Sequence, residues 1–312
     1  MKKIIYIMVT GLLLSCGNQT EIIEKKDNST AEILSQLEKK SEFFTFSIDS
    51  IPIIIGLEGT VITIPSECLV HQDDKLPKGE VTIELKEFYS ASDILFNNLT
   101  TQTKSGLLQT AGMIYIQATS ENKVLKVKDG KSFEIKFPII GNVKKGMQLY
   151  RGKIEKDFIS WDDTPISDSA MTINLDLIRE GVGLPSQRNL DYYIFESGIT
   201  WWINCDKQLE GADKTILSIK IDTVIIPHIR IVFPSLKTAA APLFEDGTLN
   251  FYNIPLEESG TIIGFYKSEN KHYIYKKEIT ISAKMKETAV FREVTLEELK
   301  AEIEAIKWKE SV

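Results

Sequence analysis

The sequence predicts a mainly β fold, built as two β-sandwich domains with a helix at the C-terminal end. Residues Glu80 to Phe88 alternate between apolar and polar side chains, which is typical of a strand with one buried face. Many other short apolar runs, bounded by turn residues, follow from residue 43 onward. The run from Thr295 has the cap and the apolar spacing of an amphipathic helix.

The first segment has the pattern of an export signal. Lys2 and Lys3 precede an apolar run over residues 4–14, which is too short to span a bilayer as a helix. The run ends in Leu13-Leu14-Ser15-Cys16, which resembles the lipobox of bacterial lipoproteins. That resemblance implies removal of residues 1–15 and acyl chains such as palmitate on mature Cys16. The alternative is an ordinary secretory signal in which Cys16 is incidental. Gly17, by the same resemblance, implies sorting to the outer membrane, on either side of it.

Residues 16–42 are expected to tether the lipid to the folded domains. The stretch from Asn18 to Lys40 is polar, charged and free of aromatic residues. Ala31, Ile33, Leu34 and Leu37 have the spacing of a short amphipathic helix, which leaves the tether interpretation unchanged.

Residues 43–183 are predicted to form the first β domain. Residues 61–64 make a strand that Pro65 stops, and residues 80–88 make the alternating strand. Residues 113–118 and 133–137 continue the pattern, and residues 147–161 read as a hairpin. Residues 90–99 are the one helical insertion, with Ser92 and Asp93 as candidate caps.

Residues 184–312 are predicted to form the second β domain. The run from Gly181 to Asn189 breaks all periodicity, which places the boundary there. The short strands that follow have the spacing of an immunoglobulin-like or transthyretin-like sandwich. These strands cover residues 190–195, 200–203, 216–221, 229–233, 249–252, 261–266 and 273–281.

The last helix is predicted from Thr295 onward. Thr295 and Glu298 form a capping box, and Leu296, Leu299, Ile303 and Ile306 form one apolar stripe. Such a stripe must be covered, either by the second sandwich or by a partner protein.

Two segments resemble known groups of proteins. Residues 59–65 and 77–85 are similar to the opening of ZU5-type β domains, where a glycine, an Ile-Pro pair and an alternating strand recur. Residues 88–89, 93–95, 108–115 and 202–207 resemble a group of uncharacterised Bacteroidota lipoproteins. The resemblance spans residues 43–307 and implies no activity, because that group has none assigned. The segments that join eukaryotic ZU5 domains to their partners are not found here.

Composition excludes one class of partner. The chain has 37 Lys and Arg against 44 Asp and Glu, and loss of Lys2 and Lys3 would change its net charge from −7 to −9. Nucleic-acid binding needs a basic surface, so we expect no nucleic-acid partner. Cys68 and Cys205 remain after lipidation. They could pair in an oxidising compartment, but their predicted placement in different domains favours two buried thiols.

No stretch has the residue types and spacing of a known catalytic, cofactor or metal site. His71, His228 and His272 are isolated in sequence, and Gly181 with Gly183 lacks the context of a dinucleotide site. The acidic loops at residues 71–74 and 162–168 could offer oxygens to calcium, but neither has the spacing of an EF-hand, and we interpret them as solvated turn carboxylates. We therefore predict no metal, no cofactor and no enzyme activity.

The run Trp201-Trp202-Ile203-Asn204-Cys205-Asp206 has the most unusual local composition. Strand alternation predicts Trp202 and Asn204 on one face and Trp201 on the other. One tryptophan is then a core residue, and the other is a candidate platform for a sugar ring or a partner. Trp201, Trp202, Asn204 and Asp206 are the candidate ligand-binding residues, while a structural turn at Asn204 and Asp206 is the alternative.

These features predict a lipid-anchored protein of the cell envelope that acts as a non-enzymatic structural or protein-interaction module. A second hypothesis is an accessory protein that presents aromatic residues to glycans, and a third is an enzyme with dispersed carboxylates. A flat patch that joins Trp201 or Trp202 to Tyr192 or Tyr193 would favour glycans. A deep cleft with paired carboxylates would favour the enzyme.

Overall fold

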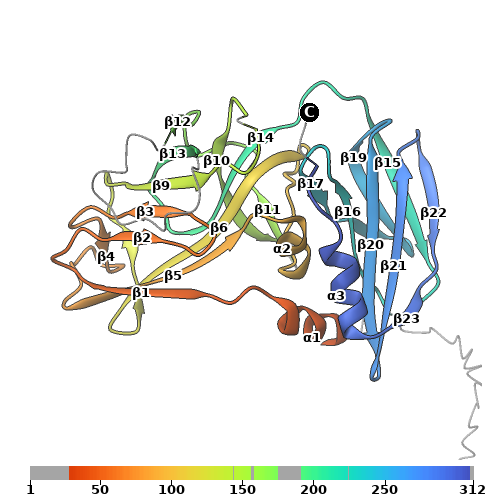
Figure 1. Ribbon diagram of the computed structural model, residues 1–312, viewed down its shortest axis with the longest axis horizontal. Helices are drawn as coiled ribbons and strands as arrows, with labels where there is room; N and C mark the ends of the chain where they lie inside the picture. Colours follow the sequence, from red (N-terminus) through yellow and green to blue (C-terminus); the bar gives the residue numbers. More distant parts are fainter. Residues whose placement is uncertain (1–27, 143, 156–157, 175–190, 224, 310–312) are drawn as a thin grey trace, which may run out of the picture.

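The computed structural model describes residues 28–142, 144–155, 158–174, 191–223 and 225–309. Strands dominate these residues, and most strand pairs are antiparallel (Figure 1). The predicted mainly β fold is therefore confirmed. None of the described helices is long and apolar enough to cross a membrane. The signal peptide and Cys16 lie outside the described residues.

Sheet I is the largest sheet, with the strand order β1-β5-β6-β14-β10-β11 and with β7 paired to β6. Val81, Ile83 and Leu85 of β5 are fully buried, as the alternation predicts. The strands of sheet I are β1 (Glu42–Ser47), β5 (Glu80–Phe88), β6 (Leu108–Ser120), β7 (Lys123–Val124), β10 (Gln148–Glu155), β11 (Phe158–Trp161) and β14 (Trp201–Gln208).

Sheet II faces sheet I across an apolar core (Figure 1). Ile83 and Ile116 from sheet I are buried together with Ile135 and Phe137 from sheet II. The order in sheet II is β12-β13-β9-β3-β2, and a separate ladder of β4 with β8 adds to the same core. The strands are β2 (Ile53–Ile55), β3 (Val61–Thr63), β4 (Leu69–Val70), β8 (Lys126–Val127), β9 (Phe133–Pro138), β12 (Met171–Asn174) and β13 (Asp191–Ser197).

The partners of β13 and β14 differ from the prediction. The sequence pattern assigns residues 190–195 and 200–203 to the second domain, but β13 pairs with β9, and β14 pairs with β6 and β10. Both strands complete sheets I and II, so this assignment is wrong. The run at 181–189 that suggested the boundary lies outside the described residues. A loss of periodicity marks a loop, but it does not identify the sheet that the next strand joins.

Sheets III and IV form the second face-to-face pair (Figure 1). Ile231 of sheet III and Leu217 and Phe251 of sheet IV are buried between them. The orders are β17-β16-β20-β21-β23 in sheet III and β18-β19-β15-β22 in sheet IV, where β15 and β22 are parallel. The strands are β15 (Lys214–Ile221), β16 (His228–Phe233), β17 (Thr238–Ala240), β18 (Leu243–Glu245), β19 (Thr248–Pro255), β20 (Ser259–Ser268), β21 (Lys271–Thr280), β22 (Met285–Ala289) and β23 (Arg292–Val294).

Three described helices lie between sheets I and III (Figure 1). We call this layer the seam: the buried cluster that joins Met113 and Trp161 of sheet I to Ile263 and Phe265 of sheet III through the helices. The helices are α1 (Asn28–Leu37), α2 (Ala91–Phe96) and α3 (Leu296–Glu304).

Helix α1 lies within the stretch predicted to be a tether. Ile33 is fully buried in the seam, and Glu32 forms an ion pair with Lys267 of β20. Residues 28–37 are thus part of the folded body, and the predicted extent of the tether is wrong for them. The apolar spacing that predicted a helix was the correct signal, because a helix with a buried apolar face needs a surface to cover it.

The other two helices begin with capping boxes. The side chain of Thr295 accepts from the Glu298 N–H at 3.1 Å, and Glu298 accepts from the Thr295 N–H, as predicted. Leu299, Ile303 and Ile306 are buried in the seam, so sheet III and α2 cover the apolar stripe. Helix α2 has Ser90 as its N-cap rather than the predicted Ser92.

Cys68 and Cys205 are separate buried thiols. Both belong to the core between sheets I and II, rather than to two different domains. Burial raises the pKa of Cys68 to about 11 and raises that of Cys205 well above its usual value, so both stay protonated at neutral pH.

Candidate ligand-binding groove

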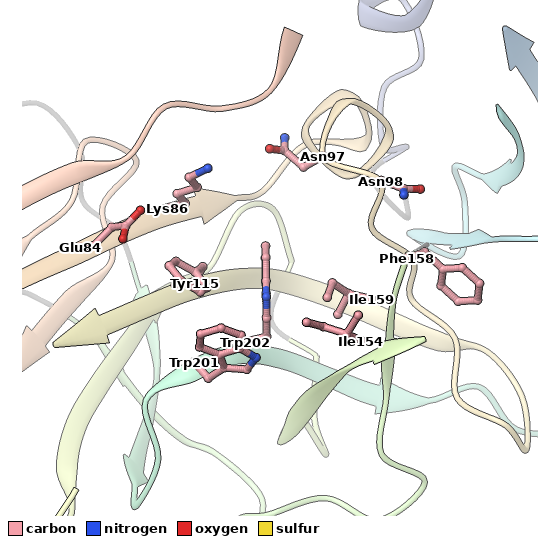
Figure 2. A pocket seen from close by; sticks show the side chains of 10 residues that line it. All are labelled: Glu84, Lys86, Asn97, Asn98, Tyr115, Ile154, Phe158, Ile159, Trp201 and Trp202. Carbon is pink, nitrogen blue, oxygen red and sulfur yellow. The ribbon is translucent and has the colours of Figure 1, made fainter. Parts of the chain in front are cut away.

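The backbone of Trp201 is the most unusual local feature of sheet I. Trp201 opens β14 at φ 111°, a conformation that is sterically costly for a bulky side chain, by about 1–3 kcal/mol. Alternation predicts opposite faces for Trp201 and Trp202, but both side chains line one groove (Figure 2). The prediction was wrong because the positive φ interrupts the period of two.

The groove is an open hollow of about 500 Å³ on the seam-facing side of sheet I. Trp201 is 40% exposed and Ile154 is 66% exposed, so both present apolar surface to solvent. The lining comes from β5, β6, β10, β11 and β14 and from the residues after α2, namely Glu84, Lys86, Asn97, Asn98, Tyr115, Ile154, Phe158, Ile159, Trp201 and Trp202.

The ring of Tyr115 packs against both tryptophan rings. Its ring centroid lies 5.3 Å from that of Trp201 and 5.1 Å from that of Trp202. Trp202 also packs on Phe88 at 5.5 Å. Gly152 of β10 leaves room for Trp202, since a Cβ on Gly152 would lie 2.4 Å from the Trp202 Cβ. The aromatic platform is therefore fixed in place by its neighbours.

Polar groups form the rim of the groove next to the α1–β1 connection. Ser41 donates to the Glu84 carboxylate, and the Lys39 N–H donates to Asn97 Oδ1 at 3.1 Å. Glu38 lies 3.8 Å from Lys86 Nζ. The rim thus offers both charges and amide groups, and residues 38–41 hold three of its side chains.

Asn204 and Asp206 do not line the groove. Both are fully buried inside β14, so the turn predicted as their alternative role is wrong. Asn204 Nδ2 donates to Asp206 Oδ2, and Thr110 Oγ1 donates to Asn204 Oδ1 at 3.2 Å. Asp206 Oδ1 has no partner, and burial raises the pKa of this carboxyl well above its usual value. Asn204 and Asp206 thus form a hydrogen-bonded polar pair inside sheet I and are not part of a ligand-binding surface.

Tyr192 and Tyr193 are buried in sheet II, away from the tryptophans. The patch that would have joined them to the tryptophans is therefore not present, and the tyrosine beside the tryptophans is Tyr115, which pairs with Trp202 across β6 and β14. Sequence reasoning missed Tyr115, although it lies on the partly exposed face of the predicted strand 113–118. The missing information was the strand register, which a single strand pattern does not contain.

The histidines and acidic loops form no shared site. Among the described residues, no group of three or more His, Cys, Asp or Glu side chains is placed to hold a metal ion. In the first acidic loop, Asp73 and Asp74 pair with Lys75 and Lys126, at 2.7 and 2.8 Å. In the second, Asp162 pairs with Lys153, and Asp163 accepts from the Ser105 N–H at 2.9 Å. Of these contacts, only the Asp73–Lys75 pair is local, while Asp74, Asp162 and Asp163 bind groups outside their own loops.

A second pocket, of about 380 Å³, lies where the start of α2, the start of β6 and the C-terminal tail meet. Gln109 and Thr110 are buried in its wall. Trp308 also lines this pocket, and its Nε1 donates to the Tyr89 carbonyl at 3.0 Å. Its wall mixes carboxylates with lysines, so no ligand class is favoured by charge.

Comparison of the chain with protein-family models, curated proteins and solved structures found no match in any of the three.

Proposed function

We propose that the protein is a lipid-anchored, non-enzymatic binding module of the cell envelope that holds a saccharide chain in the aromatic groove. In this proposal the mature protein is attached to the outer membrane through Cys16. It comprises two β-sandwich domains, the first ZU5-like and the second immunoglobulin-like or transthyretin-like. The resemblance of residues 13–16 to a lipobox supports the anchor, and the two pairs of packed sheets support the architecture.

The observation that carries the saccharide assignment is the platform made by Trp201, Trp202 and Tyr115. The C–H faces of sugar rings are apolar and stack on aromatic rings, while their hydroxyls need hydrogen-bonding groups beside the platform. Lys86 supplies such a group at the rim. The strained backbone at Trp201 also supports binding, since such strain concentrates at ligand sites.

Binding rather than hydrolysis follows from the carboxylates. Most glycosidases place two carboxyl groups on either side of the scissile bond. Among the described residues that line the groove, Glu84 is the sole carboxylate. A second candidate is a protein partner in the same groove, favoured by the exposed apolar side chain of Ile154.

Substitution of the exposed tryptophan tests the saccharide assignment. Trp201→Ala should weaken binding to a panel of envelope and host polysaccharides by about tenfold or more, because it removes the most exposed of the three rings of the platform. Phe244→Ala is the matched control, since Phe244 is 45% exposed but lies in β18. Equal binding by the two variants, or capture of a protein that Trp201→Ala abolishes without any glycan binding, would contradict the proposal.

The anchor is tested separately. Cys16→Ser should leave the protein unprocessed or free of lipid, because the acylated thiol is lost. Membrane fractionation and mass spectrometry of the mature N-terminus give the answer. A wild-type protein that is soluble and unmodified would refute the lipid anchor and leave the groove untouched.

A further inference from the structure

A buried arginine lies directly behind the aromatic groove. Arg230 of β16 is 5% exposed, and its guanidinium carbon lies 5.7 Å from the centre of the Phe158 ring. Its Nη2 donates to Asn98 Oδ1, and its Nη1 donates to the Ile229 carbonyl at 2.8 Å. Asn98 and Phe158 both line the groove (Figure 2). One layer of side chains therefore separates the guanidinium from the groove.

The positive charge of Arg230 is not neutralised within the described residues. No carboxylate is paired with it, its contacts are an amide, a carbonyl and a ring, and its Nε has no partner. Burial lowers its pKa to about 9, which still leaves it charged at neutral pH. A buried charge without a counter-charge destabilises a fold, by several kcal/mol when nothing compensates it.

None of the described neighbouring groups supplies the missing negative charge. His228, two residues away on the same face of β16, is buried, has no partner at Nε2, and has a pKa held well below its usual value by burial and by Arg230. On the groove side, Glu84 and Lys86 lie at the opposite end from Phe158 (Figure 2), and Lys86 lies 3.8 Å from Glu38, so neither is paired with Arg230. Among the described residues, Arg230 is thus the charged group behind the end of the groove at Asn98 and Phe158, which we call the inner end.

We propose that the ligand is an acidic saccharide whose carboxylate sits at this inner end of the groove, next to Asn98 and Phe158 and within the field of Arg230. This inference rests on the proposed saccharide binding. When a sugar ring covers the platform it excludes water, which lowers the local dielectric and strengthens the attraction between carboxylate and guanidinium. Arg230 then acts as a specificity residue, and Trp201 and Trp202 supply the stacking.

The test separates charge from stacking. Oligogalacturonate, oligoguluronate and hyaluronan oligosaccharides are titrated into the full protein, each beside the same oligosaccharide with its carboxyls reduced to primary alcohols. Neutral glucan and mannan oligosaccharides complete the series. At least one acidic form should bind about tenfold tighter than its reduced partner, equivalent to about 1.4 kcal/mol. That preference should fall as salt increases, while binding of the reduced form should not.

Two variants assign the preference to Arg230. Arg230→Met keeps the length and apolar stem of the side chain and should abolish the tenfold preference while retaining binding of the reduced form. Arg230→Lys should keep part of the preference for the acidic form. Thermal melting confirms that each variant is folded. If Arg230→Met does not fold, the salt dependence of wild-type binding tests the proposal instead, and a preference for the acidic form that does not fall with salt would overturn it.

The outcomes separate the two proposals. Equal binding of acidic and reduced forms, or binding of neutral glycans alone, overturns the acidic ligand and leaves saccharide binding in place. No binding of any oligosaccharide overturns both.

Discussion

Sheet I borders two apolar layers: the core that it shares with sheet II and the seam that it shares with sheet III. Both layers bury similar apolar side chains, but they differ in how completely their buried polar groups are hydrogen-bonded. In the first core, Ile135 and Phe137 meet Ile83 and Leu85 across a layer of apolar side chains. In the seam, Asp206, His228 and Arg230 each keep a buried atom without a hydrogen-bond partner, whereas elsewhere in the described part of the first sandwich this holds for His71 alone, after β4. These side chains lie on the seam-facing sides of their strands. Asn204, two residues before Asp206, is paired with Tyr150, and Arg230 is paired with Ile263; both partners belong to the seam.

This difference indicates that the first core serves the stability of the fold, while the seam also serves its function. Buried polar groups are normally satisfied, and incomplete hydrogen bonding is concentrated where a structure serves something other than its own stability. The groove opens from the seam side of sheet I, so the incompletely satisfied layer is also the layer next to the candidate ligand site.

Loss of apolar volume should have similar energetic costs in the two layers but different consequences for the groove. Leu299→Ala in the seam and Ile135→Ala in the first core, both fully buried, should each destabilise by about 2–5 kcal/mol. Leu299→Ala should also increase hydrogen exchange in α2 and β11, because these elements share its cluster. Ile135→Ala should not. Equal exchange in both variants would show that the seam is no looser than the core.

Removal of the buried carboxyl should change how stability depends on pH. The native pKa of Asp206 is raised, so the native state holds a proton that the unfolded chain releases. Wild-type stability therefore falls as pH rises from the unfolded pKa toward the native one, by at most about 1.4 kcal/mol per pH unit. Asp206→Asn should remove this fall, which denaturant titrations between pH 4 and pH 8 can measure.

Asp163→Asn is the control for that experiment, because hydrogen bonds from Ser105 lower the pKa of Asp163. Its contribution has the opposite sign: it is present above the unfolded pKa and is lost as pH falls through the native one. If Asp206→Asn kept the wild-type pH profile, the carboxyl would be ionised in the native state.

The smallest effect concerns the cap of α3. Thr295→Ala should cost about 1 kcal/mol, since the Glu298 N–H loses its acceptor. Thr295→Ser keeps the hydroxyl and should restore most of the stability in thermal melts. A cost for Thr295→Ala as large as that of Leu299→Ala would mean that the cap, rather than burial in the seam, holds the helix.

Local features of the fold could be predicted because local chemistry determines them. The alternation of β5 and the capping box at Thr295 and Glu298 both follow from side chains a few residues apart. The sheet that β13 and β14 join could not be predicted, because pairing with β9 and β6 depends on contacts far apart in sequence. The composition of residues 201–206 correctly drew attention to the tryptophans. It gave no sign of Tyr115 or Arg230, which only strand register and the seam bring near them.

The positive φ of Trp201 has a consequence for how this position changes over evolution. Glycine is the residue that adopts such a backbone with little strain, so random substitution should drift toward it wherever the ring is not used. A tryptophan persists there only under selection for its side chain. Residue 201 is therefore a marker: homologues that keep the aromatic residue should share the ligand, and those with glycine should have lost it.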